Sequence, residues 1–324
     1  MTDHAEQGAH LTEAARLHGV SAHDLTELGA YESDVYSFTS AHGPAILKVM
    51  APGHRTTDQV QAEVDWLLAL AEAAVPVALP VPAASGAWVE EVEPSGHLVV
   101  AFSRAPGGVS KPAEWTPELL ELWGEVLGKL QVHTRGWTPP GPRRRVMIDS
   151  SHITALGEVA QDDPQFHAAA SALLARVRPL IDGSGDSGLI HSDLHHGNLL
   201  LHEGGWTAID FDDSAYASYA FDLAMPIYYS TRSLRDRSLS EAAEFYIPPF
   251  MRGFRRHAPD PVASVEDLEA IMRFRRAEEA LAINYRFAQD KITPALRAYG
   301  TDLRDRVVSG AEFMPLDVLA QTLA

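Results

Sequence analysis

Four polar residues in the second half of the chain have the types and the spacing of a site that transfers a phosphoryl group. His191, Asp193 and Asn198 occur in the order H-x-D-x-x-x-x-N within the stretch LIHSDLHHGN. Asp210 follows twelve residues after Asn198, at the end of a short apolar run that reads as a strand. In such a pattern one carboxylate aligns a hydroxyl and takes its proton, while an amide oxygen and a second carboxylate bind magnesium. We therefore expect Asp193 to be the general base and Asn198 and Asp210 to be metal ligands.

The chemistry of phosphoryl transfer requires these residue types. ATP carries a dense negative charge, which must be neutralised at the moment of transfer. Magnesium is a hard cation that prefers oxygen ligands, so asparagine and aspartate suit it, whereas cysteine, which this chain lacks, would not. The sequence thus predicts ATP and Mg²⁺ as cofactors.

The stretch HSDLHHGN, followed by IDFDD, resembles the aminoglycoside phosphotransferase and choline kinase family. The usual family form has glycine after the histidine, where this chain has Ser192. The chain also has Asp212 after Asp-Phe, where a protein kinase would have glycine, and this favours the small-molecule family over ordinary protein kinases. Asp212 could assist metal or substrate binding.

The resemblance implies an α+β, two-lobed protein-kinase-like fold. Residues 1–103 would form a small N-lobe with an antiparallel sheet that covers the nucleotide. Residues 104–324 would form a larger, mainly helical C-lobe with the catalytic loop and the acceptor-binding helices. ATP and Mg²⁺ would lie between the lobes, and the γ-phosphoryl would pass to a hydroxyl of a small molecule.

The N-terminal part predicts a hairpin and a helix that carry two further charged residues. β-forming residues from 35 to 49, split by a turn at 41–44, place Lys48 on a strand. The helix expected at 57–73 has Glu63 on its apolar face. The resemblance implies that Lys48 contacts the phosphates and pairs with Glu63. The alternative is an edge-strand lysine and an ordinary helix carboxylate.

Nucleotide contacts from the backbone are expected at two places. The loop 28–38 takes the place of a phosphate-covering loop but lacks G-x-G-x-x-G, and backbone N–H groups around Glu32, Ser33 and Asp34 could cradle phosphate. The predicted strand that ends before Pro106-Gly107-Gly108 is interpreted as leading into the connection between the lobes. The resemblance makes 102–105 the hinge that contacts adenine, with Phe102 and Arg104 in it.

Residues around the catalytic loop have supporting roles in this interpretation. Asp222, in a helical pattern at 217–230, matches a family aspartate that accepts hydrogen bonds from the loop backbone; the alternative is a plain helix cap. His191 would hold the loop, His195 could touch substrate, and His196 would be exposed.

Further helices are predicted along the chain, and two loops separate some of them. Thr116-Pro117-Glu118 is a good helix start. The basic run Arg143, Arg144 and Arg145, at the end of the loop 136–145, is interpreted as a solvated surface turn. The other helical patterns lie at 10–18, 165–181, 240–256, 265–289 and 302–323, and the second loop at 182–188.

The composition limits the classes of binding partner that we expect. The net charge is −18, opposite to that of a typical nucleic-acid binder, and an acidic surface could either steer a cationic substrate or only aid solubility. No run is apolar enough to cross a membrane, and the N-terminus does not resemble a secretory signal, so a cytoplasmic location is expected.

Several alternatives remain at this stage. The histidines around Asp193 could serve a metal-dependent hydrolase, although that would leave Asn198 and Asp210 unexplained. A Ser/Thr protein kinase of the stress-response type and a non-catalytic nucleotide-binding module are two further possibilities. The acceptor is open among aminoglycosides, amino alcohols, homoserine and sugars. Candidates for its recognition, without a readable motif, are Glu278, Glu279, Asn284, Tyr285 and Arg286.

Overall fold

The described part of the chain divides into two compact units, each of which is presented by itself. The computed structural model describes residues 3–30, 33–160, 162–287 and 292–324, so Glu32 of the expected phosphate loop lies outside it. The first unit comprises the chain up to Gly108 together with residues 136–144 and 200–212. The second comprises residues 109–135, 145–199 and 213–324.

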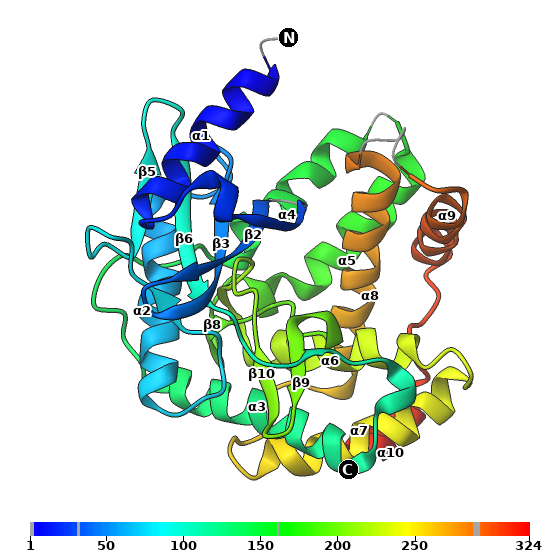
Figure 1. Ribbon diagram of the computed structural model, residues 1–324. Coiled ribbons are helices and arrows are strands. Elements are labelled where there is room, and N and C mark those ends of the chain that lie inside the picture. Colours follow the sequence, from blue (N-terminus) through cyan, green and yellow to red (C-terminus); the bar gives the residue numbers. More distant parts are fainter. Residues whose placement is uncertain (1–2, 31–32, 161, 288–291) are drawn as a thin grey trace. The chain divides into compact units, whose positions relative to one another are not determined.

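The first unit is built on an antiparallel sheet (Figure 1). Its order is β1-β2-β3-β6-β4, and β5 also pairs with β6. The expected hairpin is present as β2 and β3, and Lys48 on β3 lies opposite Val35 and Val100. The strands are β1 (Thr26–Ala30), β2 (Ser33–Ser40), β3 (Gly43–Met50), β4 (Pro80–Val81), β5 (Val89–Val92) and β6 (His97–Ser103).

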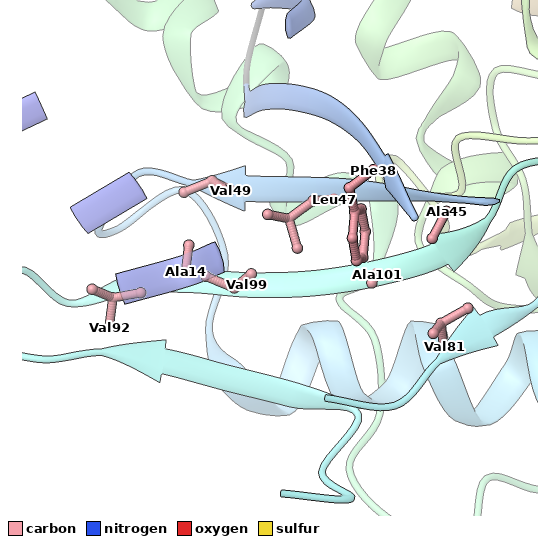
Figure 2. Close-up of a cluster of buried hydrophobic side chains, with 9 residues drawn as sticks. All are labelled: Ala14, Phe38, Ala45, Leu47, Val49, Val81, Val92, Val99 and Ala101. Atoms are coloured by element: carbon pink, nitrogen blue, oxygen red, sulfur yellow. The ribbon is translucent and has the colours of Figure 1, made fainter. Parts of the chain in front are cut away.

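Helices pack against both faces of this sheet. Because side chains alternate along a strand, Leu47 and Val49 of β3 face α1 (Asp3–Leu17), whose Ala14 shares their apolar cluster (Figure 2). Met50 points to the other face, toward α2 (Thr57–Glu72). Lys48 has the same parity as Met50 and therefore also faces α2. The short η1 (Ala22–Asp24) follows α1.

A second small hairpin brings Asp210 into the first unit. It consists of β9 (Leu199–His202) and β10 (Gly205–Ala208), and β7 (Gly108–Val109) also pairs with β9. The backbone N–H of Ala208 donates to Pro76 O at 2.8 Å, and the N–H of Ala78 donates to Ala208 O at 3.0 Å. Because β10 is anchored in this way, the Asp210 backbone is fixed two residues beyond its end.

The second unit is mainly helical, and a two-stranded sheet frames its catalytic loop. β8 (Ser187–Ile190) pairs antiparallel with β11 (Ala215–Ser218), so the loop that begins at His191 follows directly on the buried end of a paired strand. The helices are η2 (Pro112–Glu114), α3 (Pro117–Arg135), η3 (Met147–Asp149), α4 (Ser151–Ala155), η4 (Leu156–Ala160), α5 (Pro164–Ile181), η5 (His196–Asn198), α6 (Tyr219–Ser233), α7 (Leu239–Arg255), α8 (Val265–Leu281), η6 (Ala282–Arg286), α9 (Pro294–Val308) and α10 (Leu316–Leu323).

Glycines let α3 and α7 approach closely. A Cβ added to Gly124 of α3 would lie 1.9 Å from Phe250 O, and one added to Gly253 of α7 would lie 1.8 Å from Glu121 O. No side chain fits at such distances, so these positions require glycine. The backbones of α3 and α7 are therefore in close contact within the second unit.

Two predicted helices end earlier than their apolar patterns indicated. The pattern at 265–289 gives α8, which ends at Leu281 and continues as a π-helical turn to Arg286. The pattern at 302–323 is two helices, because Gly310 adopts φ +69° and Pro315 precedes α10. Within the described ranges, no helix combines the length and apolar character needed to cross a membrane.

Candidate active site

Asp193 lies in the second unit. One of its two carboxylate oxygens forms a shorter contact with neighbouring side chains than the other does. Arg275 Nη2 donates to Asp193 Oδ1 at 2.8 Å, whereas His195 Nε2 lies 3.4 Å from Oδ2. Burial by itself raises the pKa of Asp193, but the charge of Arg275 and the hydrogen bond from His195 more than offset it. The pKa therefore lies below its usual value, so this carboxylate is ionised at neutral pH.

Asn198 leaves one suitable atom for a cation. Its amide nitrogen donates to Asp193 O at 3.0 Å and faces Asp193 Oδ2 at 3.5 Å. Because both contacts use the nitrogen, Oδ1 is the atom of this amide that could bind a hard cation.

The backbone of the catalytic loop is tied to α6 through Asp222. The buried carboxylate accepts the N–H of His191 at 3.3 Å and that of Ser192 at 2.9 Å, and burial raises its pKa despite these bonds. The N-cap of α6 is Ser218 and not Asp222. Ser192 itself adopts φ +67°, the left-handed region, and its Oγ donates to Asp213 O at 2.7 Å.

The three histidines of the loop have different surroundings. His191 is fully buried, and its Nδ1 accepts the N–H of Asp193 at 3.4 Å. The ring of His195 lies 4.9 Å from that of Tyr229. The expectation that His196 is simply exposed is wrong, because its ring packs edge-on against Trp115 at 5.6 Å, and burial lowers its pKa to about 4.

A small cavity with both polar and apolar lining residues lies beside this loop within the second unit. Ser192, the residue before the expected base, is part of its wall. Burial raises the pKa of Glu278 to about 7, although the charge of Arg275 lowers it. The arginine therefore compensates only part of the cost of burying a charged Glu278 carboxylate. The cavity is lined by Arg145, Met147, Ser150, Ser192, Asp213, Ala215, Phe221, Arg275 and Glu278.

The other acceptor candidates have partners of their own. Glu279 forms an ion pair with Arg232 at 2.6 Å and accepts a short hydrogen bond from Tyr228. Asn284 donates to Ala280 O and Gly300 O, both at 2.8 Å, inside the π-helical turn. In a similar way, Tyr285 OH donates to Asp163, the N-cap of α5, at 2.7 Å. Arg286 has contacts of its own and is not part of the wall of this cavity.

Lys48 belongs to the first unit, where its ammonium lies against two aspartates. Nζ is 3.0 Å from Asp210 Oδ1 and 3.3 Å from Asp212 Oδ2. Burial lowers the pKa of Lys48, but these two charges raise it above its usual value. The side chain of Asp210 is 53% exposed, and its backbone adopts φ +61°, so the carboxylate is presented from a turn.

Glu63 is buried as its apolar face indicated, but its ion pair differs from the expected one. Glu63 is 2% exposed, and Oε2 lies 3.8 Å from Arg144 Nη2. No ion pair joins it directly to Lys48, which acts on it only as a nearby charge. Burial raises the pKa of Glu63 to about 7, although Arg144 and Lys48 both lower it.

The interpretation of the basic run as a solvated turn is wrong for Arg144. This residue is 4% exposed and donates to Gln59 O on α2 at 2.7 Å. It also donates to the carbonyl oxygens of Phe211, at 3.4 Å, and of Asp212. Arg144 therefore ties the segment after Asp210 to α2. Its neighbour Arg145, in the second unit, pairs with Asp213 at 3.1 Å.

Replacing Arg144 by methionine is expected to destabilise the protein by about 3 kcal/mol, because it leaves the buried Glu63 without its ion-pair partner and removes the hydrogen bonds of Arg144 to three carbonyl oxygens. Chemical denaturation of purified protein would measure this change. Arg143→Met is the matched control, since Arg143 is exposed on the same turn. Equal stability of the two variants would show that Arg144 contributes no more than a surface residue.

Asp212 is engaged on both carboxylate oxygens inside the first unit. His54 Nε2 lies 2.9 Å from Oδ2, and Arg55 Nε donates to Oδ1 at 3.1 Å. Burial raises the pKa of Asp212, but His54, Lys48 and Arg55 together lower it well below its usual value. In the described structure, the Asp212 carboxylate thus contacts the basic side chains of Lys48, His54 and Arg55.

The residues expected to touch nucleotide lie on sheet ends of the first unit. Ser33 opens β2, and its buried Oγ has no hydrogen-bond partner among the described residues. Phe102 is on β6. The N–H groups of Ser103 and Arg104 donate to Leu79 O and Pro44 O, so both are already engaged within the first unit.

The chain belongs to the phosphotransferase enzyme family, because the model of that family matches residues 24–259. This confirms the resemblance drawn from the catalytic stretch. Amicoumacin kinase of Bacillus subtilis (strain 168) is 29% identical over 254 residues, which cover 75% of this chain and 75% of that protein. An uncharacterized protein of Deinococcus radiodurans is 28% identical over 272 residues, covering 80% and 76%.

Solved structures confirm the α+β kinase-like fold. The amicoumacin kinase hAmiN, in complex with AMP-PNP, Ca²⁺ and Ami, has a TM-score of 0.87 at 23% identity and covers 99% of this chain and 100% of that one. A microcompartment-associated aminopropanol kinase has a TM-score of 0.66 at 24% identity, with 92% and 94% covered. The protein is thus a small-molecule kinase that acts on an alcohol group, and not a metal-dependent hydrolase.

The sequence alone did not indicate that Arg144, Arg275, His54 and Arg55 contact the expected site residues. Each contacts an expected site residue from a distant position; Arg275, for example, is 82 residues from Asp193. No local motif marks them.

Proposed function

We propose that the protein transfers the γ-phosphoryl group of ATP to a hydroxyl group of a small acceptor that carries an amine. The observation that supports this most directly is the ionised Asp193 carboxylate, paired with an arginine, Arg275, that lines a cavity together with Ser192 and Glu278. The Glu278 carboxyl would bind an ammonium group, while the adjoining hydroxyl approaches the base.

In this proposal each expected site residue has one role. Asp193 accepts the proton of the acceptor hydroxyl. Lys48 exchanges its contact with Asp210 for one with the phosphates, and the unpartnered Oγ of Ser33 donates to a phosphate oxygen. Glu63 supports this region through Arg144 and through its charge.

The donor set fits a divalent cation that prefers oxygen. Asn198 Oδ1 and the exposed carboxylate of Asp210 are each oxygen donors of the kind that such a cation prefers. Bound Mg²⁺ would neutralise phosphate charge during transfer. The solved complex of amicoumacin kinase with AMP-PNP and Ca²⁺ supports a nucleotide and a divalent cation in this fold.

The acceptor class can be tested with a coupled assay for ADP release. Amicoumacin, 1-amino-2-propanol and other amino alcohols, an aminoglycoside, homoserine, and amine-free sugars and alcohols would be compared at equal concentration. We expect turnover with an amine-bearing acceptor, and we expect Glu278→Gln to raise its KM by about tenfold, since a charged hydrogen bond contributes about 1.5–3 kcal/mol. Efficient turnover of amine-free acceptors alone would contradict the amine assignment but leave the kinase assignment intact.

A further inference from the structure

Arg275, on α8, joins three groups around the expected base. Its Nη2 donates to Asp193 Oδ1 at 2.8 Å and its Nε donates to Tyr229 OH at 2.8 Å. Its Nη1 lies 3.4 Å from Glu278 Oε2. A planar guanidinium bound on three sides has one orientation, and it therefore fixes the orientation of the groups it binds.

This arrangement distinguishes the two oxygens of Asp193. Oδ1 is occupied by the strong contact with Arg275. Among the described residues, Oδ2 has only longer contacts, at 3.4 Å with His195 and 3.5 Å with Asn198. An incoming hydroxyl can therefore form its hydrogen bond with Oδ2 without breaking the ion pair.

We propose that Arg275 is a positioning residue for phosphoryl transfer, which holds Asp193 so that Oδ2 faces the acceptor. The inference rests on the proposed function. In the step itself the acceptor O–H bond breaks and its proton passes to Oδ2, the acceptor oxygen bonds to the γ-phosphorus, and the bond from that phosphorus to the ADP oxygen breaks. Arg275 takes no part in these bond changes.

Arg275 also links the cavity to the expected base. Arg275 and Glu278 line the same cavity as Ser192, so a bound acceptor contacts the residue that orients the base. Through Arg275, occupation of the cavity and orientation of Asp193 depend on each other. A residue needed only for folding would show no such link.

Arg275→Ala is expected to lower kcat by about 10- to 100-fold, the usual effect of removing a group that orients a functional side chain, while KM for ATP stays unchanged. Because the cavity borders the deleted side chain, added guanidinium chloride, far below denaturing concentrations, should restore part of the turnover, whereas equal sodium chloride should not. Arg275→Lys should retain more activity than Arg275→Ala. The matched control is Arg273→Ala on the same helix, where Arg273 lies 3.9 Å from Glu269; it should keep full activity. Wild-type kcat in Arg275→Ala, or a loss that neither lysine nor guanidinium restores, would overturn the proposal.

A melting experiment tests the ion pair independently of turnover. Arg275→Ala leaves the Asp193 charge without its cation and should lower the melting temperature, and the further change Asp193→Asn should raise it again. Strictly additive effects of the two changes would overturn the pairing. Absence of turnover by the wild-type protein with every acceptor would instead refute the proposed function, while the melting cycle would still report the pair.

Discussion

Asp193→Asn is expected to lower kcat by about 10²-fold or more, because asparagine cannot take the proton of the acceptor hydroxyl. The variant keeps the size of the side chain, and its amide oxygen can still accept the hydrogen bond from Arg275. The fold should therefore persist. Steady-state rates with the best acceptor would measure the effect.

Nucleotide binding should be almost unchanged in this variant, since Asp193 has no proposed contact with ATP. Titration calorimetry with a non-hydrolysable ATP analogue would check this. Asp182→Asn is a suitable control, because Asp182 is exposed in the loop before β8 and its carboxylate accepts hydrogen bonds from the nearby Ser184. Full turnover by Asp193→Asn would remove this residue from the mechanism.

Asp210→Asn is expected to abolish the stabilisation of the protein by ATP analogue and Mg²⁺ together. For the wild type, ligand at a hundredfold excess over its Kd should add about 2.7 kcal/mol of stability. Asparagine is the better replacement than alanine, because Asp210 adopts φ +61° and asparagine tolerates the left-handed region. The substitution thus removes charge with little backbone strain.

Melting curves with nucleotide alone, cation alone and both would separate the two ligands. In Asp210→Asn the joint stabilisation should vanish, while the protein without ligand melts close to the wild type. Asp58→Asn, at an exposed position in the first turn of α2, should behave as the wild type. Undiminished joint stabilisation in Asp210→Asn would show that this carboxylate does not bind the cation.

Local patterns predicted much of the framework of the first unit. The β2–β3 hairpin follows from β-forming residues split by a turn, and α2 follows from the 3.6-residue period of its apolar residues. The position of Glu63 among apolar residues correctly indicated a buried carboxylate. Each of these features is determined by residues close together in the sequence, so it can be predicted from the sequence alone.

The partners of the charged residues could not be predicted in the same way. Three consecutive arginines in a proline-rich loop look like a surface turn, and only the folded chain shows that Arg144 reaches the carbonyl groups after Asp210. The helix that carries Arg275 was predicted, but its rotation about its own axis, which sets the contact with Asp193, depends on packing across the whole second unit.

The backbone angle of Ser192 has a consequence for how relatives are sought. A non-glycine residue in the left-handed region costs about 1–2 kcal/mol, and here two hydrogen bonds, to Asp222 and Asp213, offset that cost. In return the chain gains a hydroxyl on the wall of the cavity. A search motif that demands glycine at this position would overlook proteins of this kind, whereas one that allows any small residue able to adopt the turn would retain them.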